Sequence, residues 1–339
     1  MNKATDLQKR WLVTRPELDA WLDGIAIHRT LVAPCDVSGL VLYRNVKTSR
    51  EIVQRFIHPV LSVKELFFPP TERLFTIQKT GQEIQLEETF PEWETIVFGV
   101  RPCDGRGVRL LDAAFLDTHP VDSFYARRRQ NTTLIGMACN KIGQNCFCSS
   151  VGIQPHDGRD MDVMLHETET GYLIETITEK GRYLIPDGTW KETEDHIQQP
   201  AFRAEFPLPE KINWAEHFGD AYWAKVSERC LSCRACAYVC PTCRCFAVHD
   251  EMIEPGEFER IRCWDACAGS NYRRVAGGHT PRSEKAERLR NRFFCKFLYY
   301  PEQYGLKTAS ACTGCGRCIE VCPAGVDITE ILAYLGRIA

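Results

Sequence analysis

The sequence contains no apolar run close to the ~20 residues that a helix needs to span a bilayer. The segment from Met1 to Thr14 lacks an apolar core of signal-peptide length. The formal net charge is only −3, so the large positive excess that favours general binding to nucleic acids is also missing. These absences predict a cytoplasmic chain with no membrane span and no nucleic-acid partner.

Cysteine is the residue that departs from ordinary composition. The chain has 339 residues, enough for two domains, and 18 of them are cysteines. Disulfides conflict with the expected compartment. Buried, inert thiols could account for isolated residues such as Cys35 and Cys295. Neither alternative explains why 13 of the 18 lie between Cys230 and Cys322.

Residues 1–205 have the pattern of an α/β domain. Buried strands are predicted at 94–100 and 133–137, where apolar and β-branched residues run together. Each strand is followed within a few residues by a cysteine, Cys103 or Cys139. Further elements are expected as a helix at 16–23, a helix from about 106, strands at 39–43, 74–79 and 83–87, and a hairpin over 162–185 with turns at 170–171 and 180–181.

The rest of the chain changes character. Residues 186–212 are polar and contain four prolines, which predicts a linker. Residues 206–339 are expected to form an α-helical ferredoxin-type domain, with a helix over 283–300 that Ser283 could cap. The predicted fold class is therefore α+β, an α/β domain followed by a helical domain with two [4Fe–4S] clusters.

Two cysteine runs carry the main functional signal. They are Cys230-x2-Cys233-x2-Cys236-x3-Cys240-Pro241 and Cys312-x2-Cys315-x2-Cys318-x3-Cys322-Pro323. This is the ligand spacing of bacterial-type ferredoxins, in which three cysteines wrap one cluster and the fourth ligates the other. One cluster is therefore assigned to Cys230, Cys233, Cys236 and Cys322, and the other to Cys312, Cys315, Cys318 and Cys240. Four-cysteine zinc sites usually use two separated CxxC pairs and fit this spacing poorly.

A third [4Fe–4S] site is predicted in the first domain. Two of its cysteines follow the buried strands, where α/β folds usually place their sites, and two lie in an Asn-Cys-Phe-Cys segment. Structural thiols and a zinc site remain alternatives. The four candidate ligands are Cys103, Cys139, Cys146 and Cys148.

Other features near the runs leave alternatives open. Cys243, Cys245, Cys263 and Cys267 could hydrogen-bond to ligand sulfurs and tune cluster potentials, or could belong to an extra site. The stretch from Arg260 to Lys296 holds ten Lys or Arg against three acidic residues. That excess is either a solvated helix face, or it compensates anionic clusters or docks an acidic partner.

Several longer motifs carry a resemblance that covers most of the chain from about residue 65. They are PPTERLF (69–75), RPCD (101–104), NCFC (145–148), CPTCRC (240–245), AGGHTPR (276–282), ERLRNR (287–292) and CTGCGRCIEVCP (312–323). The chain resembles the iron–sulfur subunit of anaerobic sulfite reductase and the related beta subunit of soluble NAD(P)-linked [NiFe] hydrogenases, also called sulfhydrogenases. Its ending, CIEVCPAGVDITEIL, is more similar to the hydrogenase branch.

The resemblance implies an electron-transfer protein that is not catalytic alone. Such a protein passes electrons between a flavin- and NAD(P)-binding subunit and a terminal catalytic subunit, either a [NiFe] hydrogenase or a sirohaem protein. The chain itself has no GxGxxG fingerprint for a dinucleotide. The alternative is an iron–sulfur enzyme with its own substrate site in residues 1–205. A DNA-binding redox sensor would need a helix-turn-helix, which the sequence lacks.

Overall fold

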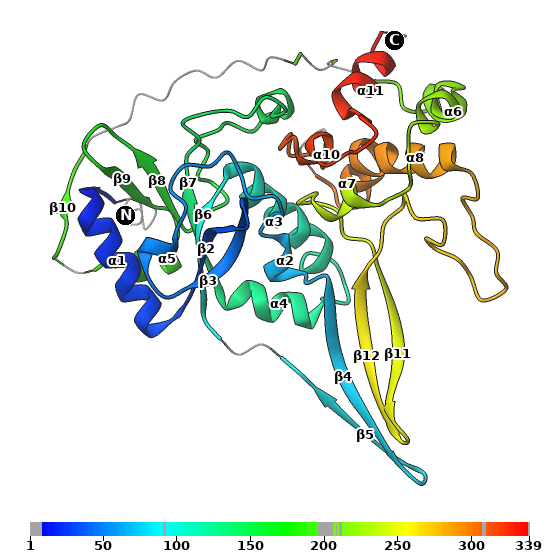
Figure 1. The fold of residues 1–339 in the computed structure, drawn as a ribbon, viewed down its shortest axis with the longest axis horizontal. Coiled ribbons are helices and arrows are strands. Elements are labelled where there is room, and N and C mark those ends of the chain that lie inside the picture. Colours follow the sequence, from blue (N-terminus) through cyan, green and yellow to red (C-terminus); the bar gives the residue numbers. More distant parts are fainter. Residues whose placement is uncertain are drawn as a thin grey trace.

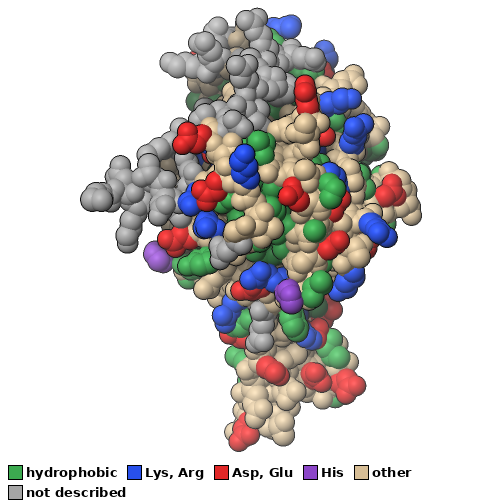
Figure 2. All heavy atoms as spheres, turned by 90° about the vertical axis from the view of Figure 1, so that its left-hand side faces the viewer, with side chains coloured by type: hydrophobic (Ala, Val, Ile, Leu, Met, Phe, Trp, Pro, Cys, Tyr) green, Lys and Arg blue, Asp and Glu red, His purple; other side chains and the backbone are tan. Residues whose placement is uncertain are grey.

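A computed structural model of the chain describes residues 9–90, 93–186, 188–194, 206–207, 209, 212–306 and 310–337. In this part an eight-stranded sheet is covered by helices, a four-stranded arm projects away from it, and short C-terminal helices gather beside it (Figures 1 and 2). None of the described helices has both the length and the apolar character needed to cross a membrane.

The large sheet has the strand order β10-β1-β9-β8-β7-β6-β2-β3. Its central pairs, from β2 through β6 and β7 to β8, are parallel, and the outer pairs are antiparallel. Parallel strands need cover on both faces. The strands are β1 Arg10–Val13, β2 Thr30–Val37, β3 Leu40–Val46, β6 Thr95–Val100, β7 Thr132–Met137, β8 Val163–Glu167, β9 Tyr172–Thr176 and β10 Lys191–Glu192.

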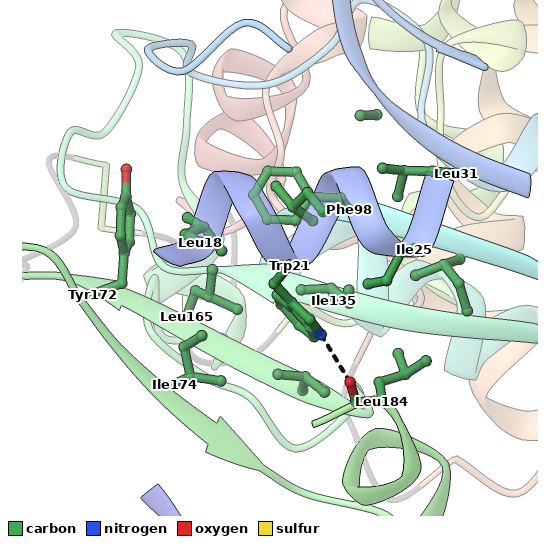
Figure 3. Close-up of a cluster of buried hydrophobic side chains, with 14 of the residues drawn as sticks. Leu18, Trp21, Ile25, Leu31, Phe98, Ile135, Leu165, Tyr172, Ile174 and Leu184 are labelled. Atoms are coloured by element: carbon green, nitrogen blue, oxygen red, sulfur yellow. Dashed lines mark hydrogen bonds between the residues drawn. The ribbon is translucent and has the colours of Figure 1, made fainter. Parts of the chain in front are cut away.

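Helix α1 (Arg15–His28) covers one face of this sheet. It begins with a capping box between Thr14 and Glu17, and it buries Trp21 and Ile25 against the strands. The indole of Trp21 donates a hydrogen bond to the Leu184 carbonyl at 2.8 Å (Figure 3). The predicted helix at 16–23 is confirmed and extends further toward the C-terminus.

The opposite face is covered by α2 (Lys64–Phe67), α3 (Pro102–Phe115) and α4 (Ser123–Gln130). Alternate residues of one strand serve the two faces, so Val97 of β6 packs under these helices and Phe98 packs toward α1. The result is a layer of strands between two layers of helices. The predicted strands at 39–43, 94–100 and 133–137 are confirmed.

The hairpin expected over 162–185 is only partly right. β8 and β9 pair antiparallel around residues 170–171, as predicted. The second predicted turn, at 180–181, is wrong because Glu179–Leu184 forms helix α5. Thr178 caps that helix by accepting a hydrogen bond from the Gly181 amide, so a glycine taken for a turn signal lies in the first helical turn.

The arm corrects a second expectation. The segment between the two cysteine runs was expected to be helical, but β11 (Phe246–Glu254) and β12 (Glu257–Trp264) form a hairpin around Pro255-Gly256. Strand β12 also pairs with β4 (Thr71–Thr80), which pairs with β5 (Glu83–Glu88). The hairpin predicted from the strands at 74–79 and 83–87 is confirmed, and its partner strands come from a distant part of the chain.

The C-terminal part is built from short helices around its own core. Phe293 of α8 (Lys285–Phe294) and Leu332 of α11 (Ile328–Leu335) are buried there. The predicted helix at 283–300 is largely confirmed, but Glu284 rather than Ser283 caps it, and it continues through a π-helical turn at Cys295–Tyr299. The remaining helices are α6 Tyr222–Ser227, α7 Ala235–Tyr238, α9 Tyr300–Gln303 and α10 Arg317–Glu320.

The predicted linker, 186–212, lies mostly outside the described residues. The division into domains 1–205 and 206–339 remains a prediction. Strands from both sides of that boundary share the arm.

Candidate iron–sulfur centres

The two cysteine runs have the same backbone conformation. In the first, Ser232 and Arg234 have positive φ angles of 56° and 68°. In the second, Gly314 and Gly316 occupy the equivalent positions with φ angles of 62° and 77°. A short helix, α7 or α10, begins directly after each. The left-handed residues turn the chain twice within each run, which wraps each loop around a common centre.

The first predicted set of ligands lines one pocket. Backbone amides point at two of its sulfurs, because Ser232 N donates to Cys230 Sγ at 3.4 Å and Val326 N donates to Cys322 Sγ at 3.2 Å. Amide hydrogen bonds of this kind stabilise thiolates and tune cluster potentials. The structure thus brings Cys322 of the second run beside Cys230, Cys233 and Cys236 of the first.

The second predicted set is buried deeper. Burial raises the pKa of Cys312 to about 12 and that of Cys315 to about 11, and the neighbouring thiolates of Cys240 and Cys318 add to both shifts. Cys240 differs, because a hydrogen bond with the Cys243 thiol and the charge of Lys296 hold its pKa well below the ordinary value. One thiolate of this set is therefore favoured before any metal arrives.

Three buried cations surround Cys240. Lys296 Nζ donates to Cys240 Sγ at 3.1 Å and to Thr242 Oγ1 at 2.9 Å. Arg292 lies one helical turn earlier, and its Nε and Nη2 atoms are buried without a hydrogen-bond partner. Lys64 stacks on the Trp264 ring at 3.8 Å. None of the three forms an ion pair with an acidic residue in the described part of the chain.

These three buried cations show whether the residues around Cys240 fit an iron–sulfur cluster. A buried cation is costly unless an anion is near. Burial alone would lower the pKa of Lys296, but the neighbouring Cys240 thiolate outweighs it and holds that pKa well above its ordinary range. An anionic thiolate-bound cluster supplies the missing countercharge, so the residues fit. Arg292 and Lys296 belong to the basic stretch noted in the sequence, and their i, i+4 spacing places them on one face of a helix, whereas nothing in the sequence pointed to Lys64.

The predicted third site is assembled at the edge of the large sheet. Cys103 lies in the first turn of α3 just after β6, and Cys139 follows β7. Together with Cys146 and Cys148 they line a second pocket. Burial raises the pKa of Cys146 to about 11 and that of Cys148 to about 12. Cys315 of the second set lines the same pocket, so these two sets of cysteines adjoin.

The Asn-Cys-Phe-Cys segment docks directly on the second run. Phe147 N donates to the Gly314 carbonyl at 2.7 Å. A Cβ atom on Gly316 would come within 2.4 Å of the Asn145 carbonyl oxygen, so only glycine allows this approach. Both glycines of the second run meet this segment, whereas the first run carries serine and arginine at the same positions.

Replacing Gly316 with alanine is expected to push the Asn145–Cys148 segment away and to lower both the melting temperature and the iron content. The methyl group has no room, and the positive φ angle adds about 1–2 kcal/mol of strain. Gly325→Ala is the matched control, because Gly325 has a φ angle of 62° and nothing within 4 Å of the added carbon. Equal losses in both variants would show that the close approach is unimportant.

A buried ion pair joins the third site to the second run. Arg317 Nη1 and Nη2 donate to the two carboxylate oxygens of Asp104, both at 2.7 Å. The side chains are 2% and 0% exposed. Arg317 also donates to the Pro59 carbonyl at 2.8 Å. The sequence motifs contained both charged residues, but nothing in their local spacing indicated that they pair.

Apart from Cys35 on β2, the remaining cysteines lie around the base of the arm. Cys245 Sγ lies 3.2 Å from the Tyr272 hydroxyl, and Arg244 Nη1 donates to Cys295 Sγ at 3.9 Å. Burial raises the pKa of Cys267 to about 12. Cys263 faces Thr71 on the neighbouring strand. Within this group, Cys243 contacts a predicted ligand, Cys240, which supports a role in tuning that sulfur.

A single metal ion and a four-iron cluster require different distances between their thiolate ligands. Zinc would draw four thiolates to within about 4 Å of one another, given Zn–S bonds of about 2.3 Å. Among the described side chains, no three Cys, His, Asp or Glu residues converge closely enough to hold one metal ion. A four-iron cluster keeps its thiolates farther apart, and the cysteine-lined pockets suit that wider spacing better.

Comparisons with known proteins agree with this arrangement. Residues 229–326 match a family model described as a 4Fe-4S dicluster domain. The chain is 32% identical over 307 residues to "Sulfhydrogenase 2 subunit beta" of Pyrococcus furiosus. The aligned region covers 86% of this chain and 87% of that protein. No solved structure matches the chain.

Proposed function

The chain belongs to the family of the sulfhydrogenase beta subunit, and on that premise we propose that it relays single electrons through iron–sulfur clusters between two other subunits of an oxidoreductase complex. When bound, the clusters supply one-electron transfer. The chain's own residues hold them, shield them from water and set their potentials.

The proposed ligand sets are three. The first is Cys230, Cys233, Cys236 and Cys322, the second is Cys240, Cys312, Cys315 and Cys318, and the third is Cys103, Cys139, Cys146 and Cys148. Each consists of four thiols, which leaves no open position for a substrate. That property favours a relay over the alternative of an enzyme with its own substrate site.

The observation that carries the proposal is that the three sets adjoin in a row. Cys315 belongs to the second set and also lines the pocket of the third. Cys236 of the first set and Cys318 of the second both face Arg292. Cys233 is exposed, whereas the second set is buried behind it. A surface end, a buried middle and a far end are what a relay between two partners requires.

The expected partners follow from the family. A flavin- and NAD(P)-binding subunit would exchange electrons at one end, and a terminal catalytic subunit would exchange them at the other. The name of the Pyrococcus relative favours a [NiFe] hydrogenase over a sirohaem protein for that terminal position.

The test is to purify the complex under anaerobic conditions through a tag on this chain. A relay predicts about twelve irons per chain, no turnover by the isolated chain, and reduction of its clusters by NAD(P)H only when the flavin subunit is present. About eight irons would remove the third cluster from the proposal. Substrate turnover by the isolated chain would overturn the relay.

Replacing Lys296 with methionine is expected to make the potential of the second cluster more negative, on the order of 100 mV, because a buried cation next to the cluster stabilises the reduced, more negative state. Redox titration followed by spin resonance measures this shift. Arg290→Met is the control, since Arg290 lies on the same helix but stacks on Phe218 at 3.7 Å. An unchanged potential in the Lys296 variant would contradict the role given to this cation.

A further inference from the structure

The four-stranded arm is an amphipathic sheet that the described part of the chain leaves uncovered on its apolar face. Cross-strand register aligns Met252 with Phe258, Phe258 with Ile77, and Ile77 with Leu86. Four apolar side chains therefore form one row across all four strands. The outer two, Met252 and Leu86, are 67% and 63% exposed.

The opposite face carries charge at the adjoining positions. There the register aligns Glu251 with Glu259, Glu259 with Thr76, and Thr76 with Glu87. Carboxylates placed directly opposite each other destabilise a sheet unless cations relieve them. From 76 to 88 and from 248 to 260 the arm has eight acidic residues against two Lys or Arg, and Figure 2 shows acidic side chains gathered on this projection.

The arm is fixed rigidly at its root. Arg262 donates to Glu72 at 2.9 Å and also pairs with Asp122, which belongs to the α/β layers. The indole of Trp264 donates to the Phe68 carbonyl at 2.9 Å. The root residues Trp264 and Arg262 pair with Phe246 and Val248, and beyond them β11 continues over residues 249–254, about 20 Å if every residue stays extended. A rigid projection of this length positions its apolar row well away from the body.

We propose that the apolar face of the arm docks on another subunit of the electron-transfer complex, at an apolar patch flanked by lysine or arginine side chains. When apolar and polar side chains alternate along its strands, a sheet has one apolar face, and that face is normally buried. The net acidity of the arm, eight acidic residues against two Lys or Arg, favours a basic partner surface and disfavours a second copy of the same arm. This inference rests on the proposed function, because it needs a complex with other subunits.

The root of the arm lies close to the first cysteine run. Its strand β11 begins at Phe246, shortly after Cys240, and Trp264 at the end of β12 stacks near Tyr238 with ring centroids 6.0 Å apart. A partner held by the arm is thereby anchored beside the relay. In this proposal the arm binds the partner subunit, and the clusters held by the cysteines transfer the electrons.

The experiment compares variants on the two faces of the arm. Met252→Glu and Leu86→Glu place a charge in the apolar row, whereas Gln85→Glu places the same charge on the opposite face, at an exposed residue that pairs with Gln78. Each is measured in the holo complex purified through a tag on this chain, by dilution and mass photometry. The two apolar-row variants are expected to reach half-dissociation at a protein concentration at least tenfold above that of the wild-type complex, and Gln85→Glu at a concentration within twofold of it.

Hydrogen exchange provides a second readout. The free amides of edge strand β11 are expected to gain protection in the complex relative to the isolated chain. Iron content equal to wild type in every variant shows that the chain still folds. If the complex forms but all three variants behave alike, docking through the arm is wrong and the relay stands. If the wild-type chain purifies alone or as a dimer of itself, both proposals are wrong.

Discussion

Replacing Asp104 with asparagine is expected to destabilise the protein by about 3–5 kcal/mol, because it leaves the Arg317 guanidinium buried without a countercharge. Burial alone would lower the pKa of Arg317, and the Asp104 carboxylate outweighs that effect. The same ion pair joins helix α3 to the second cysteine run, so the iron content should fall as well. Thermal unfolding and iron analysis of the purified chain measure both effects.

Two further variants show whether the cost comes from the buried charge. Asp117→Asn breaks an ion pair with Arg109 whose side chains are 52% and 54% exposed, and it should cost less than about 1 kcal/mol. Adding Arg317→Met to Asp104→Asn removes the orphaned charge and should restore part of the lost stability. If Asp104→Asn costs no more than Asp117→Asn, the buried pair does not hold the two parts together.

Replacing Cys322 with serine is expected to abolish the same low-temperature spin-resonance signal as Cys233→Ser, although the two cysteines belong to different runs. Both line one pocket, so both are proposed to ligate one cluster. About four irons per chain should be lost in either variant. Cys240→Ser should instead abolish the signal that is lost in Cys315→Ser.

The control for these variants is Cys263→Ser. Cys263 lies on strand β12 and faces Thr71, so its replacement should leave iron content and every signal unchanged. The crossed assignment is wrong if Cys322→Ser abolishes the signal that Cys315 controls and spares the one that Cys233 controls.

Local chemistry was readable from the sequence because it depends on few neighbouring residues. The positions of Cys230, Cys233 and Cys236 along the chain define a loop of one size, and the structure has that loop. The strands before Cys103 and Cys139 were predicted from unbroken apolar runs. The β4–β5 half of the arm was predicted, but the β11–β12 hairpin was missed, because β11 is exposed along its length and charged residues such as Asp250 interrupt its apolar positions.

The sequence by itself determined the spacing of the proposed thiol ligands and most of the α/β elements, since spacing within a run and periodicity within an element are properties of a short stretch of chain. Only the tertiary structure decided that the three cysteine sets adjoin, that Arg292 and Lys296 face them, and that Asp104 pairs with Arg317. Those contacts join residues far apart in the chain. Their energies come from burial and opposite charge, which exist only after the layers have packed.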